Sequence, residues 1–195
     1  MPRIGVFGAM ASGKSTVSKW FREWGAALVE GDALGWSVLE EPEIVAGLRA
    51  EFGPRIVDAS GGIDRARLGP VVFAEPAAMD RLNALVQPRL RARVRAALEE
   101  APPGVVVLDA AMLTTWGLEP ELDGVVEVRA AEERRLERLR ASRGYAEAEA
   151  LARILGQRLP PVRNAKRHWV LQNDGGSAEL RRAAEEVWRE IAALR

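Results

Sequence analysis

Cysteine is absent from the 195 residues, and histidine occurs once, as His168. The lack of cysteine excludes a disulfide framework and a thiolate metal site. The single histidine excludes a metal site built from several histidines. A chain without cysteine fits the reducing cytoplasm, and we expect this protein to be cytoplasmic.

An excess of charge of one sign is also lacking, because 28 basic and 28 acidic residues cancel. A dedicated nucleic-acid-binding protein normally carries a basic surplus, so we expect no nucleic-acid partner. No apolar run is long enough to span a bilayer, and no signal-peptide core follows the N-terminus. The sequence therefore predicts a soluble intracellular protein with no membrane partner, acting as a monomer or a weak homo-oligomer.

Short apolar runs alternate with helical patterns along the chain. Residues 4–7, 27–29, 105–108, 125–128 and 169–171 read as strands, and the first lacks alternation, as in a buried parallel sheet. Helices are expected from Gly13, after Asp32, from Pro42, over most of 64–100, over 132–143 and after Ser177. This alternation predicts an α/β fold with a parallel sheet, in a single domain.

Helix boundaries have their own signals. Pro70, Pro76 and Pro88 are expected to break or start helices, and Ser177 to cap the last one. Val17, Trp20, Phe21 and Trp24 recur at helical spacing, which predicts a core face rather than a functional aromatic cluster.

Gly8, Asp32 and Asp109 each come just after a predicted strand. In parallel sheets the carboxyl ends of the strands meet at one edge, where ligands bind. We therefore expect these three residues at the same edge of the sheet.

The residues from Gly8 to Ser15 match the pattern G-x-x-x-x-G-K-S/T in full, between a strand and an amphipathic helix. Glycines permit the tight turn and the close approach of a ligand, so that backbone N–H groups cradle phosphates at the start of a helix. The pattern predicts a site for the phosphates of a purine nucleoside triphosphate. Its candidate binding residues are Gly8, Ala11, Ser12, Gly13, Lys14, Ser15 and Thr16.

Within this loop, Lys14 is expected to place its charge on the β and γ phosphates. The hydroxyl of Ser15 is expected to bind Mg²⁺, and Thr16 is a candidate contact for the α-phosphate. A simple glycine turn before a helix is the alternative, but it gives no reason for the Lys-Ser pair directly after Gly13.

Two carboxylates complete the expected edge. Asp32 is the candidate base that accepts the proton of an attacking hydroxyl, with a helix N-cap as an equally open alternative. Asp109 is a candidate Mg²⁺ ligand, directly or through water, with capping of the following turn as its alternative.

The stretch from 134 to 167 is rich in cations, some of which would stabilise charge as part of a closing lid. A solvated charged surface is the better reading for most of them. The candidates are Arg138, Arg140, Arg143, Arg153, Arg158, Arg163, Lys166 and Arg167.

Taken together, the sequence resembles the dephospho-CoA kinase family over nearly its whole length. The resemblance is carried by the residues at 4–17, 24–26, 29–33, 52–54, 63–65, 72–73, 83–91, 136–139, 157, 170 and 173–175, all in the family's order. It implies a P-loop NTPase three-layer fold with a core of about 1–33, 101–140 and 168–195. It also implies a helical acceptor-binding region of about 34–100 and a lid of about 141–167.

The resemblance further implies the transfer of the γ-phosphoryl group of ATP, with Mg²⁺, to the 3′-hydroxyl of dephospho-CoA. On this reading Asp32 is the base, Asn173 belongs to the nucleotide site, and Lys14 and a lid arginine meet the phosphates. The lid arginine expected after Ala141 is Ser142 here, and Arg143, one place on, is the candidate in its stead.

The chain departs from the family elsewhere too. Gln87 stands for a histidine, Gln172 for an aspartate, and the run after Asp109 lacks the proline, aromatic residue and glutamate of the family. Two other readings stay open: another small-molecule kinase of the nucleoside-monophosphate type, and a regulatory module that binds ATP without turnover.

Overall fold

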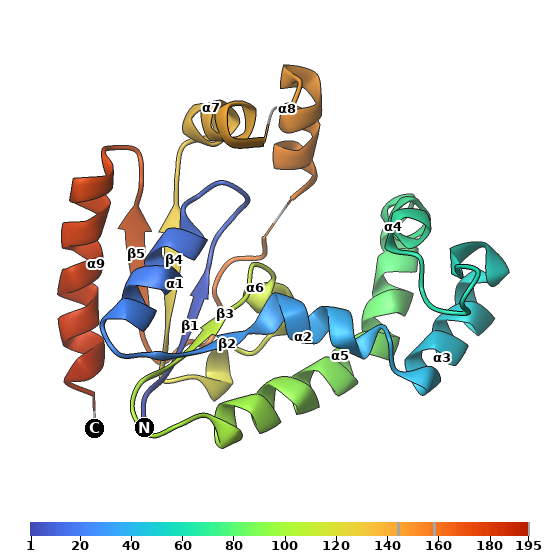
Figure 1. Ribbon diagram of the computed structural model, residues 1–195, viewed down its shortest axis with the longest axis horizontal. Coiled ribbons are helices and arrows are strands. Elements are labelled where there is room, and N and C mark those ends of the chain that lie inside the picture. Colours follow the sequence, from blue (N-terminus) through green and yellow to red (C-terminus); the bar gives the residue numbers. More distant parts are fainter. Residues whose placement is uncertain (144, 158, 195) are drawn as a thin grey trace. The chain divides into compact units, whose positions relative to one another are not determined.

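The computed structural model describes residues 1–143, 145–157 and 159–194, without the side chains of Phe73, Pro76, Ser142 and Arg143. Over this range the chain forms a five-stranded sheet in the order β2-β3-β1-β4-β5 (Figure 1). Its strands are β1 (Arg3–Phe7), β2 (Ala27–Glu30), β3 (Val106–Asp109), β4 (Gly124–Arg129) and β5 (His168–Gln172). Every neighbouring pair runs parallel, so the predicted α/β fold with a parallel sheet is confirmed.

Helices connect the strands. They are α1 (Lys14–Glu23), α2 (Gly31–Val38), α3 (Pro42–Phe52), α4 (Arg65–Phe73), α5 (Pro76–Glu100), α6 (Leu113–Trp116), α7 (Glu132–Arg143), α8 (Glu147–Gly156) and α9 (Ser177–Ala192). Short 3₁₀ turns lie at Pro54–Ile56 and Glu119–Glu121. Among the residues described, no helix has the length and apolar character needed to cross a membrane.

Three helix-boundary predictions are wrong. Pro70 and Pro88 lie inside α4 and α5, where neither breaks the helix. A proline removes one backbone hydrogen bond, and the intact turns on either side hold the helix together. Ser177 is the first residue of α9 rather than its cap: Gly176 is the cap residue, with no side-chain hydrogen bond.

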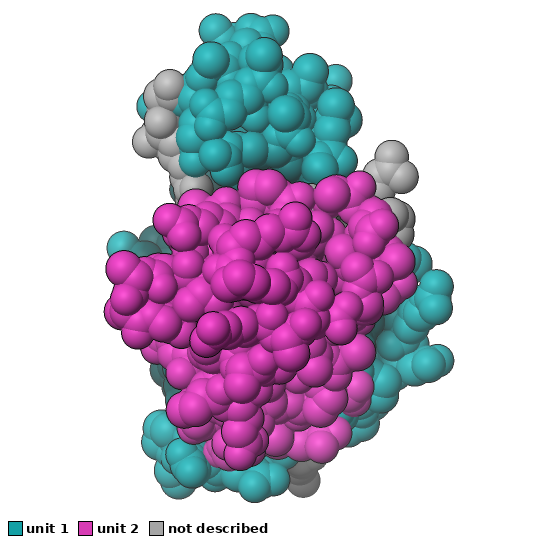
Figure 2. Space-filling model, turned by 90° about the vertical axis from the view of Figure 1, so that its right-hand side faces the viewer, with its two compact units in different colours: residues 1–32, 97–195 teal, residues 33–96 magenta. Residues whose placement is uncertain are grey.

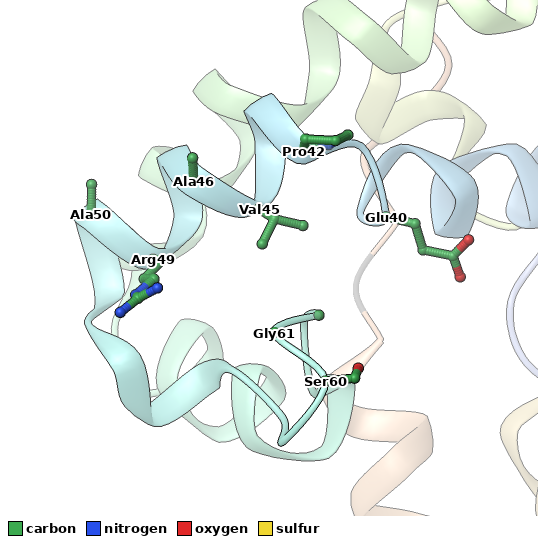
Figure 3. Close-up of a pocket in the computed structure, with 9 residues that line it drawn as sticks. Glu40, Pro42, Val45, Ala46, Arg49, Ala50, Ser60 and Gly61 are labelled. Carbon is green, nitrogen blue, oxygen red and sulfur yellow. The ribbon is translucent and has the colours of Figure 1, made fainter.

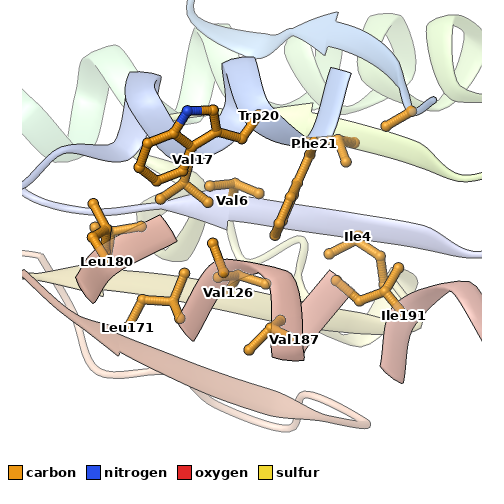
Figure 4. Packing of buried hydrophobic residues seen from close by; sticks show 14 residues of the cluster. Ile4, Val6, Val17, Trp20, Phe21, Val126, Leu171, Leu180, Val187 and Ile191 are labelled. Carbon is orange, nitrogen blue, oxygen red and sulfur yellow. The ribbon is translucent and has the colours of Figure 1, made fainter. Parts of the chain in front are cut away.

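One face of the sheet packs against α1 and α9. Val17, Trp20 and Phe21 of α1 are buried against strand residues such as Val6 and Val126 (Figure 4). Trp24 packs at the edge of the same cluster, so the aromatic residues of α1 belong to the core, as predicted. Each large side chain buried in this way contributes about 1.5–3 kcal/mol, which fixes α1 and hence the loop before it.

The other face of the sheet packs against α6 and the segment that follows it. A Cβ added at Gly5 of β1 would lie 2.8 Å from a methyl carbon of Leu122 and against Leu113 of α6. Both leucines are fully buried. The segment after β3 therefore packs directly on the central strand, with helical or turn structure on both sides of the sheet.

Two compact units make up the chain: residues 1–32 with 97–195, and residues 33–96 (Figure 2). The first holds the sheet. The second has its own core, in which Leu48, Phe52, Ile56, Leu68 and Val72 are buried. Within this second unit Glu41, just before α3, binds Arg89 and Arg93 of α5.

Candidate active site

The strand register brings the expected residues to one edge. Val6 is level with Asp109, and Glu30 is level with the same residue from the other side. β1 ends one residue later, just before Gly8, and Asp32 follows the end of β2 by two residues. The prediction that Gly8, Asp32 and Asp109 share an edge of the sheet is therefore confirmed.

The loop from Gly8 to α1 adopts a tight backbone path. The N–H of Ser12 donates to the carbonyl of Ala9 at 3.0 Å, and that of Thr16 donates to Gly13 at 3.0 Å. Ala11 has φ 62° and Gly13 has φ 102°, both in the left-handed region. Ser12 between them lies outside the left-handed region, so left-handed and other residues alternate. This alternation turns successive N–H groups toward one side of a loop, as in backbone nests that bind anions.

Two glycines of the motif make room for this path. A Cβ at Gly8 would collide with the carbonyl oxygen of Val128 and come within 2.6 Å of the Ser12 hydroxyl. A Cβ at Gly13 would overlap the side-chain amide of Asn173. Since either substitution would push the loop away from the sheet, the motif glycines are required by packing as well as by backbone angle.

Lys14 lies between two carboxylates. Its Nζ forms an ion pair with Asp109 Oδ1 and lies 3.6 Å from Asp32 Oδ2. The side chains of Lys14 and Asp109 are each 14% exposed, whereas that of Asp32 is 43% exposed. Asp109 is thus the more deeply buried partner of the ammonium, and Asp32 is the partner whose carboxylate is accessible to solvent.

Asp32 is fixed by the backbone of a second segment. It is the second residue of α2, so the helix-cap alternative for it is wrong. Its carboxylate accepts the N–H of Ala111 at 3.1 Å. Burial raises its pKa above the ordinary aspartate value, against the lowering effects of Lys14 and the Ala111 N–H, and nearby Asp109 raises it further. A carboxylate with a raised pKa is a stronger proton acceptor once ionised.

The outer side of the loop contacts α7 and the turn after β5. Arg138 Nη1 donates to the carbonyl of Ala11 at 3.2 Å, and Arg138 Nη2 donates to the carbonyl of Asn173 at 2.8 Å. The side-chain amide of Asn173 donates to the carbonyl of Ser12 at 2.7 Å. Asn173 and Arg138, both singled out from the sequence, therefore reach the loop through its backbone.

Met10 in the same loop is held from two sides. Its carbonyl accepts Arg135 Nε at 2.9 Å, and its N–H donates to Gln157 Oε1 at 2.5 Å. The sequence reasoning missed Arg135. Its spacing of three from Arg138 was the available signal, since residues three apart share a face of a helix.

The other predicted cations of this stretch mostly lie at the surface. Arg140 pairs with Glu147 at 3.0 Å and Arg153 with Glu149 at 3.0 Å, both largely exposed. Lys166 pairs with Asp123 at 2.9 Å. The solvated-surface reading holds for these three residues. Arg167 donates to the carbonyl of Asp123, and Arg163 uses its backbone N–H to bind Glu119. The side chain of Arg143, and Arg158, lie outside the described residues.

The residues at this edge suit a hard cation that is shared with phosphate. No cluster of three or more histidine, cysteine, aspartate or glutamate side chains able to hold a metal occurs among the described residues. Asp109 offers one carboxylate, and Ser15 offers an exposed hydroxyl in the first turn of α1. Mg²⁺ is commonly bound by one or two protein oxygens together with phosphates and water, so this sparse set fits it.

Comparison with known proteins gives a consistent family. The family model described as dephospho-CoA kinase matches residues 3–179. A dephospho-CoA kinase of Thermobifida fusca is 35% identical over 193 residues, covering 98% of this chain and 96% of that protein.

Solved structures agree on the fold. The protein TT1252 from Thermus thermophilus superposes with a TM-score of 0.78 at 32% identity, covering 97% of both chains. The dephospho-CoA kinase from Campylobacter jejuni superposes with a TM-score of 0.66 at 20% identity, covering 97% of this chain and 96% of that one. The second likeness supports the fold alone.

Proposed function

The chain belongs to the dephospho-CoA kinase family, and we propose that it transfers the γ-phosphoryl group of ATP to the 3′-hydroxyl of dephospho-CoA, forming coenzyme A. The observation that carries the proposal is the position of Lys14 between Asp109 and Asp32, at the end of a complete phosphate loop. A loop alone names no reaction. The additional carboxylate of Asp32, exposed and 3.6 Å from the lysine ammonium, supplies the proton acceptor that transfer to a hydroxyl needs.

The phosphate loop would hold the triphosphate. Its backbone N–H groups and the start of α1 face the phosphate oxygens, and Lys14 neutralises charge on the β and γ groups. The proposed nucleotide-binding residues are Gly8, Ala11, Ser12, Gly13, Lys14, Ser15, Thr16 and Asn173. Little covalent chemistry is required of the protein, since positioning and charge stabilisation supply most of the catalysis in phosphoryl transfer.

Ser15 and Asp109 would hold Mg²⁺, through the hydroxyl and the carboxylate, either directly or through water. The ion, when bound, neutralises charge that develops on the phosphate oxygens. In this arrangement Lys14 exchanges part of its contact with Asp109 for contact with phosphate, because both compete for the same ammonium.

Asp32 would orient the acceptor hydroxyl and accept its proton on a carboxylate oxygen as the phosphoryl group is transferred. Its hydrogen bond from the Ala111 N–H fixes the carboxylate in one orientation. The bond that forms joins the acceptor oxygen to the γ-phosphorus, and the bond that breaks joins that phosphorus to the β–γ bridging oxygen.

The proposed acceptor-binding region, about 34–100, contains most of the second unit, residues 33–96. It holds a pocket of about 750 Å³ between α3 and the turn at 60–62, lined by Val45, Ala46, Arg49 and Ser60 among others (Figure 3). A hollow of this size, with an apolar wall, the guanidinium of Arg49 and the carboxylate of Glu40, suits part of a molecule as large as dephospho-CoA. The remaining proposed parts are the core at 1–33, 101–140 and 168–195 and the lid at 141–167.

We assign Arg143 the role of the lid cation that stabilises the transferring phosphoryl group. The reason is its position in the sequence: the arginine expected at 142 is a serine here, and Arg143 is the next residue. Arg143→Ala should lower kcat more than it raises KM for ATP. We further propose that the protein acts as a monomer or a weak homo-oligomer. The proposed location is the cytoplasm, where ATP is the abundant phosphoryl donor.

The test uses purified protein, MgATP and a panel of acceptors. Mass spectrometry should detect the 3′-phosphorylated product with dephospho-CoA, and turnover of nucleoside monophosphates should be far slower. Faster turnover of a nucleoside monophosphate would favour the other kinase class. ATP binding without turnover of any acceptor would favour a regulatory module.

A further inference from the structure

The outer side of the phosphate loop is held by side chains from distant parts of the chain. Three consecutive carbonyls, those of Met10, Ala11 and Ser12, each accept a side-chain hydrogen bond. The donors come from α7 and from the turn after β5, more than 120 residues along the chain. Side chains from outside the loop therefore hold its outer carbonyls in place.

Arg138 and Asn173 form the centre of this arrangement. Arg138 also donates through Nη2 to Asn173 Oδ1 at 3.1 Å, so the guanidinium fixes the amide whose Nδ2 binds the Ser12 carbonyl. Asn173 is only 7% exposed, and its own backbone N–H is bound by the carbonyl of Arg129 at 2.8 Å. Its amide occupies the space that a side chain at Gly13 would fill.

We propose that Arg138 and Asn173 are positioning residues for phosphate binding, which act by holding the Ala11 and Ser12 carbonyls on the outer side of the loop. A peptide plane has its N–H and C=O on opposite sides, so holding a carbonyl outward turns the N–H of the next residue inward. The N–H groups turned in this way are those of Ser12, which donates to the Ala9 carbonyl at 3.0 Å and closes the turn, and of Gly13, which faces the phosphate side of the loop. The loop then meets a phosphate already ordered, which lowers the ordering cost of binding.

The backbone angles explain why such support is needed. Ala11 carries a side chain and yet has φ 62°, a region that residues other than glycine adopt at a cost. Without outside hydrogen bonds the peptide units on either side of Ala11 are free to rotate to a less strained path. Arg135 and Arg138 bind the carbonyls of Met10 and Ala11, on either side of that strain, and Asn173 binds the carbonyl of Ser12, one peptide further on.

This inference rests on the proposed function only for the identity of ATP as the natural ligand. It concerns anion binding by the loop, which is measurable without any acceptor. Inorganic tripolyphosphate carries the phosphates without the nucleoside, so it separates an effect on the loop from a direct contact between Arg138 and the base or ribose of ATP.

The experiment measures Kd for MgATP and for tripolyphosphate by calorimetry on full-length variants. Asn173→Asp keeps the acceptor for Arg138 and removes the donor to the Ser12 carbonyl. Arg138→Lys keeps the charge and removes the fork that reaches two partners. We expect each to weaken the binding of both ligands about tenfold, the scale of one lost charge-assisted hydrogen bond, while KM for dephospho-CoA stays unchanged. Arg134→Ala, which breaks an exposed pair with Glu137 on the same helix, is the matched control and should change neither Kd.

A double variant tests whether the two residues act as one unit. Kd for tripolyphosphate is measured for Arg138→Ala, for Asn173→Ala and for the variant that carries both. The loss of affinity in the double variant should be several-fold smaller than the product of the two single losses, since both residues support the same stretch of loop. Multiplicative losses would overturn the shared mechanism, and so would a loss for ATP with none for tripolyphosphate. Unchanged Kd values in Asn173→Asp and Arg138→Lys would overturn the inference altogether. If an alanine variant fails to fold, these two milder variants decide the outcome.

Discussion

Lys14 in the phosphate loop and Arg153 of α8 are both cations that the sequence offers as candidates for phosphate contact, yet their surroundings differ. The side chain of Lys14 is 14% exposed and lies between two carboxylates from other strands or helices. That of Arg153 is 44% exposed and pairs with Glu149 on its own helix at 3.0 Å. One cation is built into the sheet edge, and the other belongs to a helical surface.

This contrast separates a fixed part of the site from an adjustable part. An ion pair at the surface contributes about 0–1 kcal/mol and exchanges partners freely. A largely buried ammonium with two carboxylates keeps its position, so its removal leaves buried charge without a partner. Substitutions in the loop should therefore have much larger effects than substitutions of the paired cations in the lid.

The largest effect is expected for Lys14→Ala. Loss of the ammonium removes the charge that meets the β and γ phosphates, and it leaves Asp109 without its partner. Turnover of ATP should fall on the order of 10³-fold, as measured by initial rates of CoA formation. Lys19→Ala, which breaks only an exposed pair with Glu23 on the same helix, is the control and should leave the rate unchanged.

Asp32→Asn should lower kcat about 10²-fold or more, because the proton acceptor is lost while the shape is kept. Kd for MgATP should change little, since the loop and Lys14 remain. A normal kcat in this variant would refute the assignment of Asp32 as the base.

The raised pKa of Asp32 gives the same variant a second readout. A carboxyl whose pKa is higher in the folded state favours folding below its unfolded pKa, and this contribution is lost as the pH rises through the folded pKa. At neutral pH the ionised carboxylate therefore lowers stability, and Asp32→Asn should raise Tm there. The gain should shrink toward acid pH, and the acid limb of kcat/KM in the unsubstituted enzyme should lie above the pH expected for an ordinary aspartate. A variant with a lower Tm at neutral pH would contradict this account.

Much of this site could be predicted from local sequence patterns, and the rest depends on long-range contacts that only the structure shows. The loop, its helix and the common edge of Gly8, Asp32 and Asp109 follow from motif spacing and from the position of each residue just after a predicted strand, both readable in short stretches of sequence. The contacts of Arg135 with Met10 and of Ala111 with Asp32 join segments 125 and 79 residues apart, and no local pattern specifies them. The prediction that Ser177 caps α9 was wrong because Gly176, one residue earlier, has the extended backbone of the cap position, so that the helix already begins at Ser177.

Asp109→Asn should have an intermediate effect. The amide keeps an oxygen ligand and loses the charge that orients Lys14 and attracts Mg²⁺. The Mg²⁺ concentration for half-maximal rate should rise about tenfold, as measured by titration at fixed ATP. An unchanged Mg²⁺ requirement would remove Asp109 from the proposed metal site.

The smallest effect is expected for Arg153→Ala. Its guanidinium pairs with Glu149 and lies over the ring of Tyr145 at 4.6 Å, so its loss changes contacts within the lid. kcat and KM for ATP should both stay within about threefold of the unsubstituted values, the scale of an exposed ion pair. A loss comparable to that of Lys14→Ala would break the distinction between the fixed loop and the adjustable lid.

The most direct test of the central claim is mass spectrometry of the product formed from MgATP and dephospho-CoA. The account predicts coenzyme A phosphorylated at the ribose 3′-position, formed by the unsubstituted protein and at a rate on the order of 10³-fold lower by Lys14→Ala. The absence of this product at high enzyme concentration, with ATP bound, would contradict it.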